Sequence, residues 1–436
     1  MLTGVKQDLP GAVAEAEARY RAANVKSLAQ FKKAGRHLPG GNTRSALHYD
    51  PFPVALDHAE HSHVYDVDGH RYIDFMNDLT AGFYGHSHPV IMETIRSTLD
   101  SGISFGGPSI CEDHLAEAIC RRIPSIERVR FCNSGTEANL VALQLARAVT
   151  GRSTVLAFEG GYHGSVLSFL SGLTALNVDE IVLARFNHAT SAKVAAAATA
   201  DDLAAIIVEP MIGSGGTILA DRDFLLTLRQ LATERGALLI FDEFQTARLA
   251  YGGLQQVLDV RPDLTTLGKF VGGGLAFGAF GGRADILDRL DPSRPDRIGH
   301  GGTFNNNVMT MAAGTAGLQR IATPEAIDEA NRRADRLRSE LQAVAKSAAV
   351  PLHSKGYGSI ISMQLQETEP KRPDQIKTTP LLRKLMHLEL LLAGFYVPRR
   401  GTINLSVATT DADCNAFAGA MGAIFDRYRP LFQEPR

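Results

Sequence analysis

Polar and ionisable residues follow three predicted strands at the points where those strands end. They are Ser134, Asp242 and Lys269, which come after strands expected over residues 129–132, 237–241 and 263–267. In an open α/β sheet, ligands bind outside the carboxyl ends of the strands, so these side chains should share one crevice. A helix that begins near Ser134 would offer N–H groups to a phosphate, although Ser134 and Glu137 also have the spacing of a capping box, which needs no function. The pattern predicts an anion site, a carboxylate and a lysine close together.

These three groups are what pyridoxal 5′-phosphate requires from a protein. The cofactor needs a cradle for its phosphate, an amine for its aldehyde, and a carboxylate that keeps its ring nitrogen protonated. Lys269 would serve first as the attachment point and then as the base that moves a proton. A surface lysine is the plain alternative, but the neighbours of Lys269 are apolar or glycine, including glycine at residues 272–274, which disfavours a solvated position.

From about residue 90 onward, short apolar segments alternate with segments of helical periodicity. Helices are expected over 89–99, 112–121, 135–149 and 224–235, and further strands over 154–158 and 205–208. This alternation favours an α/β fold with a mostly parallel sheet covered by helices on both faces.

The two ends of the chain have a different pattern. A helix is expected over 13–33, short strands over 53–57, 63–67 and 71–75, and a long helix over 325–346. The N-terminal strands suggest a small antiparallel appendage, with Asp68-Gly69 as a hairpin turn. We therefore divide the chain into residues 1–75, 76–322 and 323–436, with the large domain in the middle.

The composition excludes several classes of protein. Hydrophobic residues make up 44% and charged residues 21%, a globular balance that rules out a disordered or fibrous chain. Lysine and arginine total 45 against 47 acidic residues, so no global field attracts nucleic acid or an anionic membrane. No apolar run approaches the ~18 residues that span a bilayer, and the N-terminus lacks the apolar stretch of a secretory signal. We expect a cytoplasmic protein with no nucleic-acid or membrane partner.

Two pairs of histidines stand two residues apart, His61 with His63 and His86 with His88. Such spacing occurs in metal sites, but no cluster of cysteines or carboxylates nearby completes one. We expect histidines in turns and on the surface, and no bound metal.

Five segments together give the sequence a specific resemblance to a known family. They are NSGTEAN at 133–139, GGYHG at 160–164, VEP at 208–210, DEFQT at 242–246 and DLTTLGK at 263–269. On these motifs the chain resembles the class III aminotransferases of fold type I, from about residue 32 to 425. The resemblance implies a large domain with a mostly parallel sheet, and a smaller α+β domain made from the N- and C-terminal segments. It is strongest to the branch that holds glutamate-1-semialdehyde aminomutase and the aromatic β-amino acid aminotransferases.

The resemblance implies which residues bind the cofactor phosphate and ring. Ser134, Gly135 and Thr136 would hold the phosphate, and Tyr162 would stack on the pyridine ring. A tyrosine of the core is the alternative for Tyr162. Thr303 would reach the phosphate held by a neighbouring subunit, which implies a homodimer with shared active sites.

The expected catalytic residues, again by resemblance, are Lys269 and Asp242. Lys269 would bind the cofactor aldehyde, Asp242 would pair with the ring nitrogen, and Gln245 would hydrogen-bond the ring oxygen. Glu209 would orient the other groups, and a structural role at the end of a strand is its alternative.

Departures from the family pattern bear on the substrate. Phe244 stands where many relatives have valine. Ser214 stands where relatives that act on terminal amines carry a glutamate, which masks an arginine that binds carboxylates. Residues 41–45 and 302–307 differ from the aminomutase and are similar to the β-amino acid aminotransferases.

Four residues are expected to contact the substrates. Arg44 matches the arginine that binds the β-carboxylate in those enzymes, and Arg400 matches the one that would receive the α-carboxylate of an acceptor such as 2-oxoglutarate. Phe83 and Tyr84 could hold an aryl side chain. Surface ion pairs are the alternative for both arginines.

The sequence therefore predicts a pyridoxal 5′-phosphate-dependent aminotransferase that moves an amino group from a β-amino acid, such as an aromatic one, to a keto acid by a ping-pong mechanism. An aminomutase, which moves the amino group within one molecule, is the nearest alternative. A racemase or decarboxylase on the same scaffold stays open, because fold does not fix the reaction. A binding module that has lost catalysis is disfavoured by the presence of Lys269 and Asp242.

Overall fold

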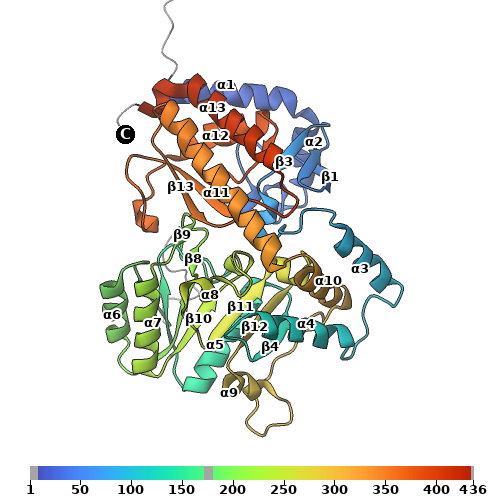
Figure 1. Ribbon diagram of the computed structural model, residues 1–436, viewed down its shortest axis with the longest axis vertical. Coiled ribbons are helices and arrows are strands. Elements are labelled where there is room, and N and C mark those ends of the chain that lie inside the picture. Colours follow the sequence, from blue (N-terminus) through green and yellow to red (C-terminus); the bar gives the residue numbers. More distant parts are fainter. Residues whose placement is uncertain (1–7, 171–179, 434–436) are drawn as a thin grey trace, which may run out of the picture.

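The computed structural model describes residues 8–170 and 180–433, which form two parts (Figure 1). The large part holds the middle of the chain and is drawn in the lower half of the figure. The small part, above it, is made from both ends of the chain, shown in blue and in orange to red.

The large part is built on one sheet. Its strands lie in the order β4 (Arg128–Cys132), β12 (Gly278–Gly282), β11 (Leu264–Gly268), β10 (Leu238–Asp242), β7 (Leu203–Val208), β5 (Thr154–Phe158) and β6 (Ile181–Ala184). Neighbouring strands from β11 to β6 are parallel, whereas β12 is antiparallel to both β4 and β11. The prediction of a mostly parallel sheet is confirmed.

The antiparallel strand β12 was not expected from the sequence, because glycine is a poor strand former. Its glycines are required by close backbone contacts. A Cβ atom on Gly278 would lie 2.2 Å from the carbonyl oxygen of Ser134, and one on Gly282 would lie 2.1 Å from that of Asp263. The strand therefore allows the start of the helix after β4 to approach the sheet closely.

Helices cover both faces of this sheet. Alternate residues of the central strands, such as Val155 and Ile207, pack with the helix α5, whereas their neighbours Leu156 and Val208 pack with α6, α7 and α8. This is the period of two expected of a sheet buried on both sides. The helices of the large part are α3 (Pro89–Leu99), α4 (Ile110–Arg122), α5 (Gly135–Thr150), α6 (Ala189–Ala198), α7 (Arg222–Arg235), α8 (Leu254–Leu258), α9 (Ala284–Leu287) and α10 (Val308–Arg320).

The small part contains two sheets and the helices that cover them. One sheet has the order β1 (Leu56–Glu60), β2 (His63–Asp66), β3 (Arg71–Asp74) and β15 (Phe395–Tyr396), and the other has β13 (Leu352–Tyr357), β14 (Ile360–Leu365) and β16 (Thr402–Asn404). Its helices are α1 (Leu9–Ala23), α2 (Val25–Ala34), α11 (Pro324–Ser347), α12 (Pro380–Leu392) and α13 (Asp411–Gln433). Because β15 pairs with β3 in parallel, the N-terminal strands are not a separate appendage but share a sheet with the C-terminal segment.

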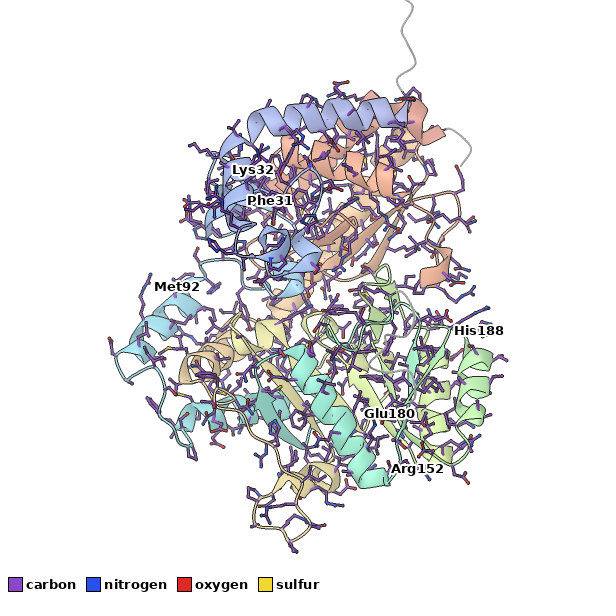
Figure 2. All side chains as sticks on the ribbon, turned by 180° about the vertical axis from the view of Figure 1, so that it is seen from behind. Phe31, Lys32, Met92, Arg152, Glu180 and His188 are labelled. Atoms are coloured by element: carbon purple, nitrogen blue, oxygen red, sulfur yellow. The ribbon has the colours of Figure 1, made fainter. Side chains whose placement is uncertain are left out.

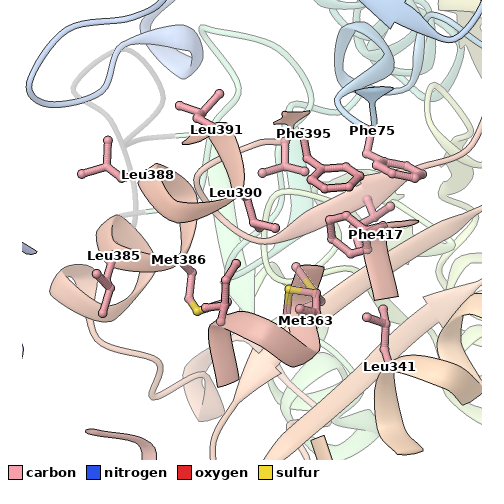
Figure 3. Close-up of a cluster of buried hydrophobic side chains, with 14 of the residues drawn as sticks. Phe75, Leu341, Met363, Leu385, Met386, Leu388, Leu390, Leu391, Phe395 and Phe417 are labelled. Carbon is pink, nitrogen blue, oxygen red and sulfur yellow. The ribbon is translucent and has the colours of Figure 1, made fainter. Parts of the chain in front are cut away.

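One hydrophobic core joins the two ends of the chain. Phe75, which follows β3, lies against Phe417 of α13, with ring centroids 4.9 Å apart, and Phe417 lies 5.2 Å from Phe395 of β15 (Figure 3). All three rings are buried. Burial of a phenylalanine side chain contributes about 1.5–3 kcal/mol, so this cluster holds the two terminal segments together.

The N-terminal helix predicted over 13–33 is in fact two helices, α1 and α2. They meet at Asn24, whose backbone leaves the helical region (φ −119°, ψ 51°). The buried Asn24 side chain donates from Nδ2 to the Tyr20 carbonyl oxygen at 2.8 Å, and the Asn24 backbone N–H donates to the same oxygen at 3.1 Å. Asparagine often competes with helix geometry in this way.

A short antiparallel pair, β8 (Met211–Ile212) with β9 (Ile218–Leu219), follows β7 and carries the loop that contains Ser214. No helix in the described ranges is long and apolar enough to cross a membrane. Within the same ranges no three histidine, cysteine or acidic side chains are grouped to hold a metal, and His86 instead contacts Asp74, with Nε2 and Oδ2 2.7 Å apart.

Candidate active site

The structure brings Ser134, Asp242 and Lys269 to one edge of the large sheet, as the sequence predicted. Ser134 caps α5 directly after β4, Asp242 is the last residue of β10, and Lys269 follows the last residue of β11. Asn139 on α5 links them, because its Nδ2 donates to Asp242 Oδ2 at 2.8 Å while its Oδ1 accepts from Thr266 of β11 at 2.8 Å.

Asp242 is held by a complete set of donors. The carboxylate is 4% exposed and receives Asn139 Nδ2 and the Phe244 backbone N–H, the latter at 3.1 Å. His163 Nδ1 lies 2.9 Å from Asp242 Oδ2. Burial lowers the pKa of His163, but the hydrogen bond and charge of Asp242 outweigh it, so the pKa of His163 is raised. Asn139 and His163 together fix the Asp242 carboxylate, the group that would face a ring nitrogen.

Lys269 is a buried amine with an unusual backbone conformation. Its φ is +58°, which is rare for a residue other than glycine, and its Nζ donates to Thr80 Oγ1 at 2.6 Å. The pKa of Lys269 is lowered from 10.5 to about 7, chiefly by burial; the charge of Asp242 opposes this effect and the positive charge of Arg400 adds to it. Lys269 is therefore partly neutral near pH 7, and a neutral amine is the form that attacks an aldehyde or accepts a proton.

The Thr80 contact was not predicted from the sequence. Residues 77–80 all have positive φ, between 44° and 82°, and Asn77 and Asp78 are types that tolerate this conformation better than most. The buried Arg248 donates from Nη1 to the Thr80 carbonyl oxygen at 3.1 Å and from Nη2 to the Leu405 carbonyl oxygen. Burial lowers the pKa of Arg248 to about 9. Arg248 thus holds the segment that places the Thr80 hydroxyl against Lys269.

The start of α5 forms an anion cradle. Ser134 Oγ accepts from the Glu137 N–H at 3.2 Å, and Thr136 Oγ1 accepts from the Ser165 N–H at 3.3 Å. The N–H groups of Gly135 and Thr136 lie in the first turn, where a helix has no internal acceptor for them. Their partial positive charge suits a phosphate.

Phe244 occupies the space left by two glycines at this edge. A Cβ atom on Gly135 would lie 2.8 Å from the Phe244 ring, and one on Gly268 would lie 1.9 Å from it. The ring therefore lies between the start of α5 and the end of β11, where relatives with valine have a smaller side chain.

Glu209 follows the last residue of β7, and Gln245 follows β10 shortly after Asp242. Glu209 accepts the backbone N–H groups of Tyr162 and Gly213, each at 3.1 Å. Burial raises the pKa of Glu209 to about 7, and the charge of Asp242 adds to this effect. Gln245 lies over Gly213, where a Cβ atom would be 2.2 Å from its Oε1. Tyr162 remains 40% exposed, so its ring has an open face and is not a core tyrosine.

The two predicted substrate arginines occupy different settings. Arg400 donates from Nη1 to Ser214 Oγ at 3.2 Å, and burial lowers the pKa of Arg400 while the charge of Glu209 opposes this effect. Among the described residues, no carboxylate lies within 4.0 Å of its guanidinium. Arg44 is half-exposed and pairs with the half-exposed Asp78, with Nη1 and Oδ1 2.5 Å apart.

Phe83 and Tyr84 do not have the position expected for residues that hold an aryl substituent. Phe83 is 0% exposed, and both rings pack on Phe270 in the core beneath the site, with Phe83 also covered by the Arg248 guanidinium. Phe83 therefore presents no free face to a ligand, whereas Tyr84, which is 3% exposed, lines a cavity of about 240 Å³ together with Asp78 and His88.

Thr303 lies in an exposed loop whose other residues reach the phosphate cradle of the same chain. Asn133 Nδ2 donates to Asn305 Oδ1 at 3.0 Å, and Asn306 Nδ2 donates to the Gly107 carbonyl oxygen at 3.1 Å. Thr303 therefore stands at the surface beside the start of α5, with its side chain exposed.

The donors at this edge fit pyridoxal 5′-phosphate. The first turn of α5 offers free N–H groups, Asp242 is a hydrogen-bonded buried carboxylate, and Lys269 is a partly neutral amine. Sequence reasoning missed Asn139, His163, Thr80 and Arg248 as parts of the site. The first two lie inside the motifs at 133–139 and 160–164, so their positions carried a signal, whereas Thr80 and Arg248 had none.

Comparison with known proteins gives consistent matches over almost the whole chain. The family model described as Aminotransferase class-III matches residues 45–399. The β-phenylalanine transaminase of Variovorax paradoxus is 43% identical over 423 residues, which cover 96% of this chain and 97% of that protein. A glutamate-1-semialdehyde 2,1-aminomutase of Rhodopirellula baltica is 38% identical over 369 residues, which cover 80% of this chain and 84% of that protein.

The fold agrees with the same relatives. The crystal structure of the β-phenylalanine aminotransferase of Variovorax paradoxus matches with a TM-score of 0.95 and 41% identity, covering 98% of this chain and 100% of that chain. This similarity confirms the fold type I architecture that the sequence motifs implied.

Proposed function

The chain belongs to the class III aminotransferases, which depend on pyridoxal 5′-phosphate, and we propose that it moves an amino group from a β-amino acid to a keto acid such as 2-oxoglutarate. The observation that carries the binding of a keto-acid acceptor is the environment of Arg400. Its guanidinium contacts the neutral Ser214 and has no carboxylate within ion-pair distance among the described residues, so it is free to bind one from a substrate. The similarity to a β-phenylalanine transaminase supports a β-amino acid as the donor and extends the proposal to aromatic β-amino acids.

In this proposal the cofactor is held by residues from four segments. Ser134, Gly135 and Thr136 bind its phosphate, the open face of Tyr162 stacks on its ring, and Gln245 donates to its ring oxygen. The bound cofactor supplies an electron sink that makes the proton on the amine-bearing carbon removable.

Lys269 and Asp242 carry out the chemical work of the protein. Lys269 Nζ takes the proton from one carbon and returns it to another, and its pKa of about 7 allows both directions near neutral pH. Asp242, fixed by Asn139 and His163, keeps the ring nitrogen protonated. Glu209 holds the Tyr162 backbone and so orients the ring above it.

Arg44 and Arg400 would each bind one substrate carboxylate, that of the amino donor in the first half-reaction and that of the keto-acid acceptor in the second. A β-amino acid has its carboxylate one carbon farther from the amine-bearing carbon than an α-amino acid, so the two acids need receptors at different positions. Arg44 lies next to the segment of residues 77–80, because its guanidinium pairs with Asp78. Arg44 would bind the β-carboxylate. Arg400, whose charge acts on Lys269, would take the α-carboxylate of the acceptor.

A homodimer with shared active sites is part of the proposal. Large apolar side chains are exposed close to Thr303, on the α3 and α4 edge of the large part, at Leu99, Ile103, Phe105, Ile110 and Phe304. Met92 marks this edge in Figure 2, and His188 marks the opposite one. A group of exposed apolar side chains beside the site favours a partner subunit there. In sedimentation experiments, Ile110→Asp should weaken self-association, whereas Val194→Asp on α6, with a similarly exposed valine, should not.

The test of the function is the need for a second substrate. The loaded enzyme is mixed with 3-amino-3-phenylpropanoate with and without 2-oxoglutarate, and glutamate formation is measured. We expect turnover only with the acceptor, and parallel lines in double-reciprocal plots, as a ping-pong mechanism requires. Acceptor-independent conversion of glutamate-1-semialdehyde, with no reaction of any β-amino acid, would instead identify an aminomutase, the alternative that the Rhodopirellula baltica relative supports.

A further inference from the structure

A small pocket lies between α12 and the segment that leads into β16. Its volume is about 30 Å³, which is enough for one ion or for the end of a larger oxyanion. Met363 and Met386, which Figure 3 shows in the core of the small part, form part of an apolar wall. The polar lining consists of Arg383 and His387 from α12, with Arg399 and Arg400 from the segment before β16.

The three guanidinium groups around this pocket have no ion-pair partner among the described residues. Among the described residues, no carboxylate lies within 4.0 Å of Arg383, Arg399 or Arg400, whereas other charged residues of α12 are paired, as Lys384 is with Glu17. Burial lowers the pKa of Arg383, and the positive charge of Arg399 lowers it further. The positive charges therefore act on each other here, and the charge of Glu209, beyond ion-pair distance, offsets that of Arg400.

His387 adds an unpartnered donor to the same pocket. Its side chain is 2% exposed and stacks edge-on against Tyr49 at 4.4 Å. Neither ring nitrogen makes a hydrogen bond of normal geometry. Burial lowers the pKa of His387 to about 3, and the charge of Arg399 lowers it as well, so the ring is neutral and carries one N–H group. A buried imidazole without a partner is costly, because its N–H group loses water and gains nothing in return.

We propose that the pocket lined by Arg383, His387, Arg399 and Arg400 binds a small oxyanion, such as inorganic phosphate or a carboxylate group. Guanidinium groups present their donors in a planar fork that matches an oxyanion, and the His387 N–H would complete the set. The bound anion would relieve the repulsion between the arginines and satisfy the buried imidazole. This site is separate from the phosphate cradle at α5, and it shares Arg400 with the proposed receptor for the acceptor carboxylate.

The test uses the cofactor-loaded protein, so that the cradle at α5 is already filled. Phosphate is titrated at constant ionic strength while the midpoint of thermal unfolding is followed. We expect a saturable rise of about 3 °C in the wild type, because a ligand that binds only the folded state stabilises it. Arg383→Gln should abolish the rise, whereas Lys384→Gln should keep it, since Lys384 is the next residue on the same helix but does not line the pocket.

Two further measurements locate the anion and identify its kind. Crystals of the loaded protein grown with phosphate should show the phosphate ion between Arg383 and Arg399. If Arg383→Gln does not fold, Arg399→Gln takes its place in the titration. A matching titration with acetate distinguishes phosphate from a carboxylate as the ligand. A rise in the unfolding midpoint with phosphate alone indicates a phosphate site, and a rise with acetate alone indicates a carboxylate site. Either rise supports the site only if the arginine variant loses it. No saturable rise with phosphate or acetate, or an equal rise in both arginine variants and the wild type, would overturn the proposal.

Discussion

The cofactor end and the carboxylate-binding end of the candidate site are built differently. Around Asp242 the carboxylate is buried and receives two hydrogen bonds, with His163 also in contact, and Asn139 links three elements of the large part. The Arg400 guanidinium has one hydrogen bond, to Ser214, and no carboxylate within ion-pair distance among the described residues. The first region holds its groups in place before any ligand binds, whereas the second leaves its charges for a ligand to neutralise. Substitutions in the first should therefore affect the chemical step, and those in the second should affect which substrate binds.

The largest effect should come from Lys269→Ala. The variant loses both the attachment point and the proton carrier, so kcat should fall by about four orders of magnitude or more while the fold is kept. Steady-state rates and the circular dichroism of the loaded protein check this. Lys193→Ala on α6 is the control and should be unchanged. Turnover by Lys269→Ala within tenfold of the wild type would contradict the assignment.

Asp242→Asn should cause the next largest loss of activity. An amide cannot keep the ring nitrogen protonated, so kcat should fall by about 10²- to 10⁴-fold while the cofactor stays bound. Rates and the visible absorbance of the bound cofactor measure the two effects separately. A variant with a normal rate would mean that this carboxylate has another role.

The contrast between the two ends also explains what the sequence could predict. Asp242, Lys269 and Ser134 were predictable because each follows a strand within a local motif, and the sheet alone brings the strand ends together. Thr80 and Arg248 were not, because they act through a segment with positive φ and through contacts between residues 80, 248 and 405. The burial of Phe83 and Tyr84 depends on packing against Phe270, which no local pattern encodes. The break at Asn24 and the glycine strand β12 were missed because side-chain caps and close backbone contacts overrode the propensities.

Arg400→Gln tests the carboxylate end. The loss of a charged hydrogen bond of about 1.5–3 kcal/mol should raise KM for 2-oxoglutarate about 10- to 100-fold and leave kcat within a few fold. Kinetics with varied acceptor measure the split between the two constants. An equal loss in kcat would place Arg400 with the cofactor end and break the distinction between the regions.

The pH dependence of cofactor attachment tests the environment of Lys269. The amine must be neutral to react, and its neutral fraction rises about tenfold per pH unit below the pKa and levels off above it. Because burial lowers the pKa of Lys269 to about 7, the rate of attachment to the cofactor-free protein should rise to about pH 7 and then stay level. Stopped-flow absorbance between pH 5.5 and 9 measures it. A rate that still climbs tenfold per unit at pH 9 would show an ordinary, solvated lysine.

The central claim is that a β-carboxylate selects the amino donor, and one pair of donors tests it most directly. 3-Amino-3-phenylpropanoate and 1-phenylpropylamine have the same aryl and amine groups, and a methyl group replaces the carboxylate in the second. The measurement is kcat/KM for the first half-reaction with each donor, in the wild type and in Arg44→Gln. We predict that the wild type prefers the acid by about 10- to 100-fold, and that Arg44→Gln removes most of this preference by slowing the acid alone. Equal rates for both donors in the wild type, or the same preference in Arg44→Gln, would contradict the account.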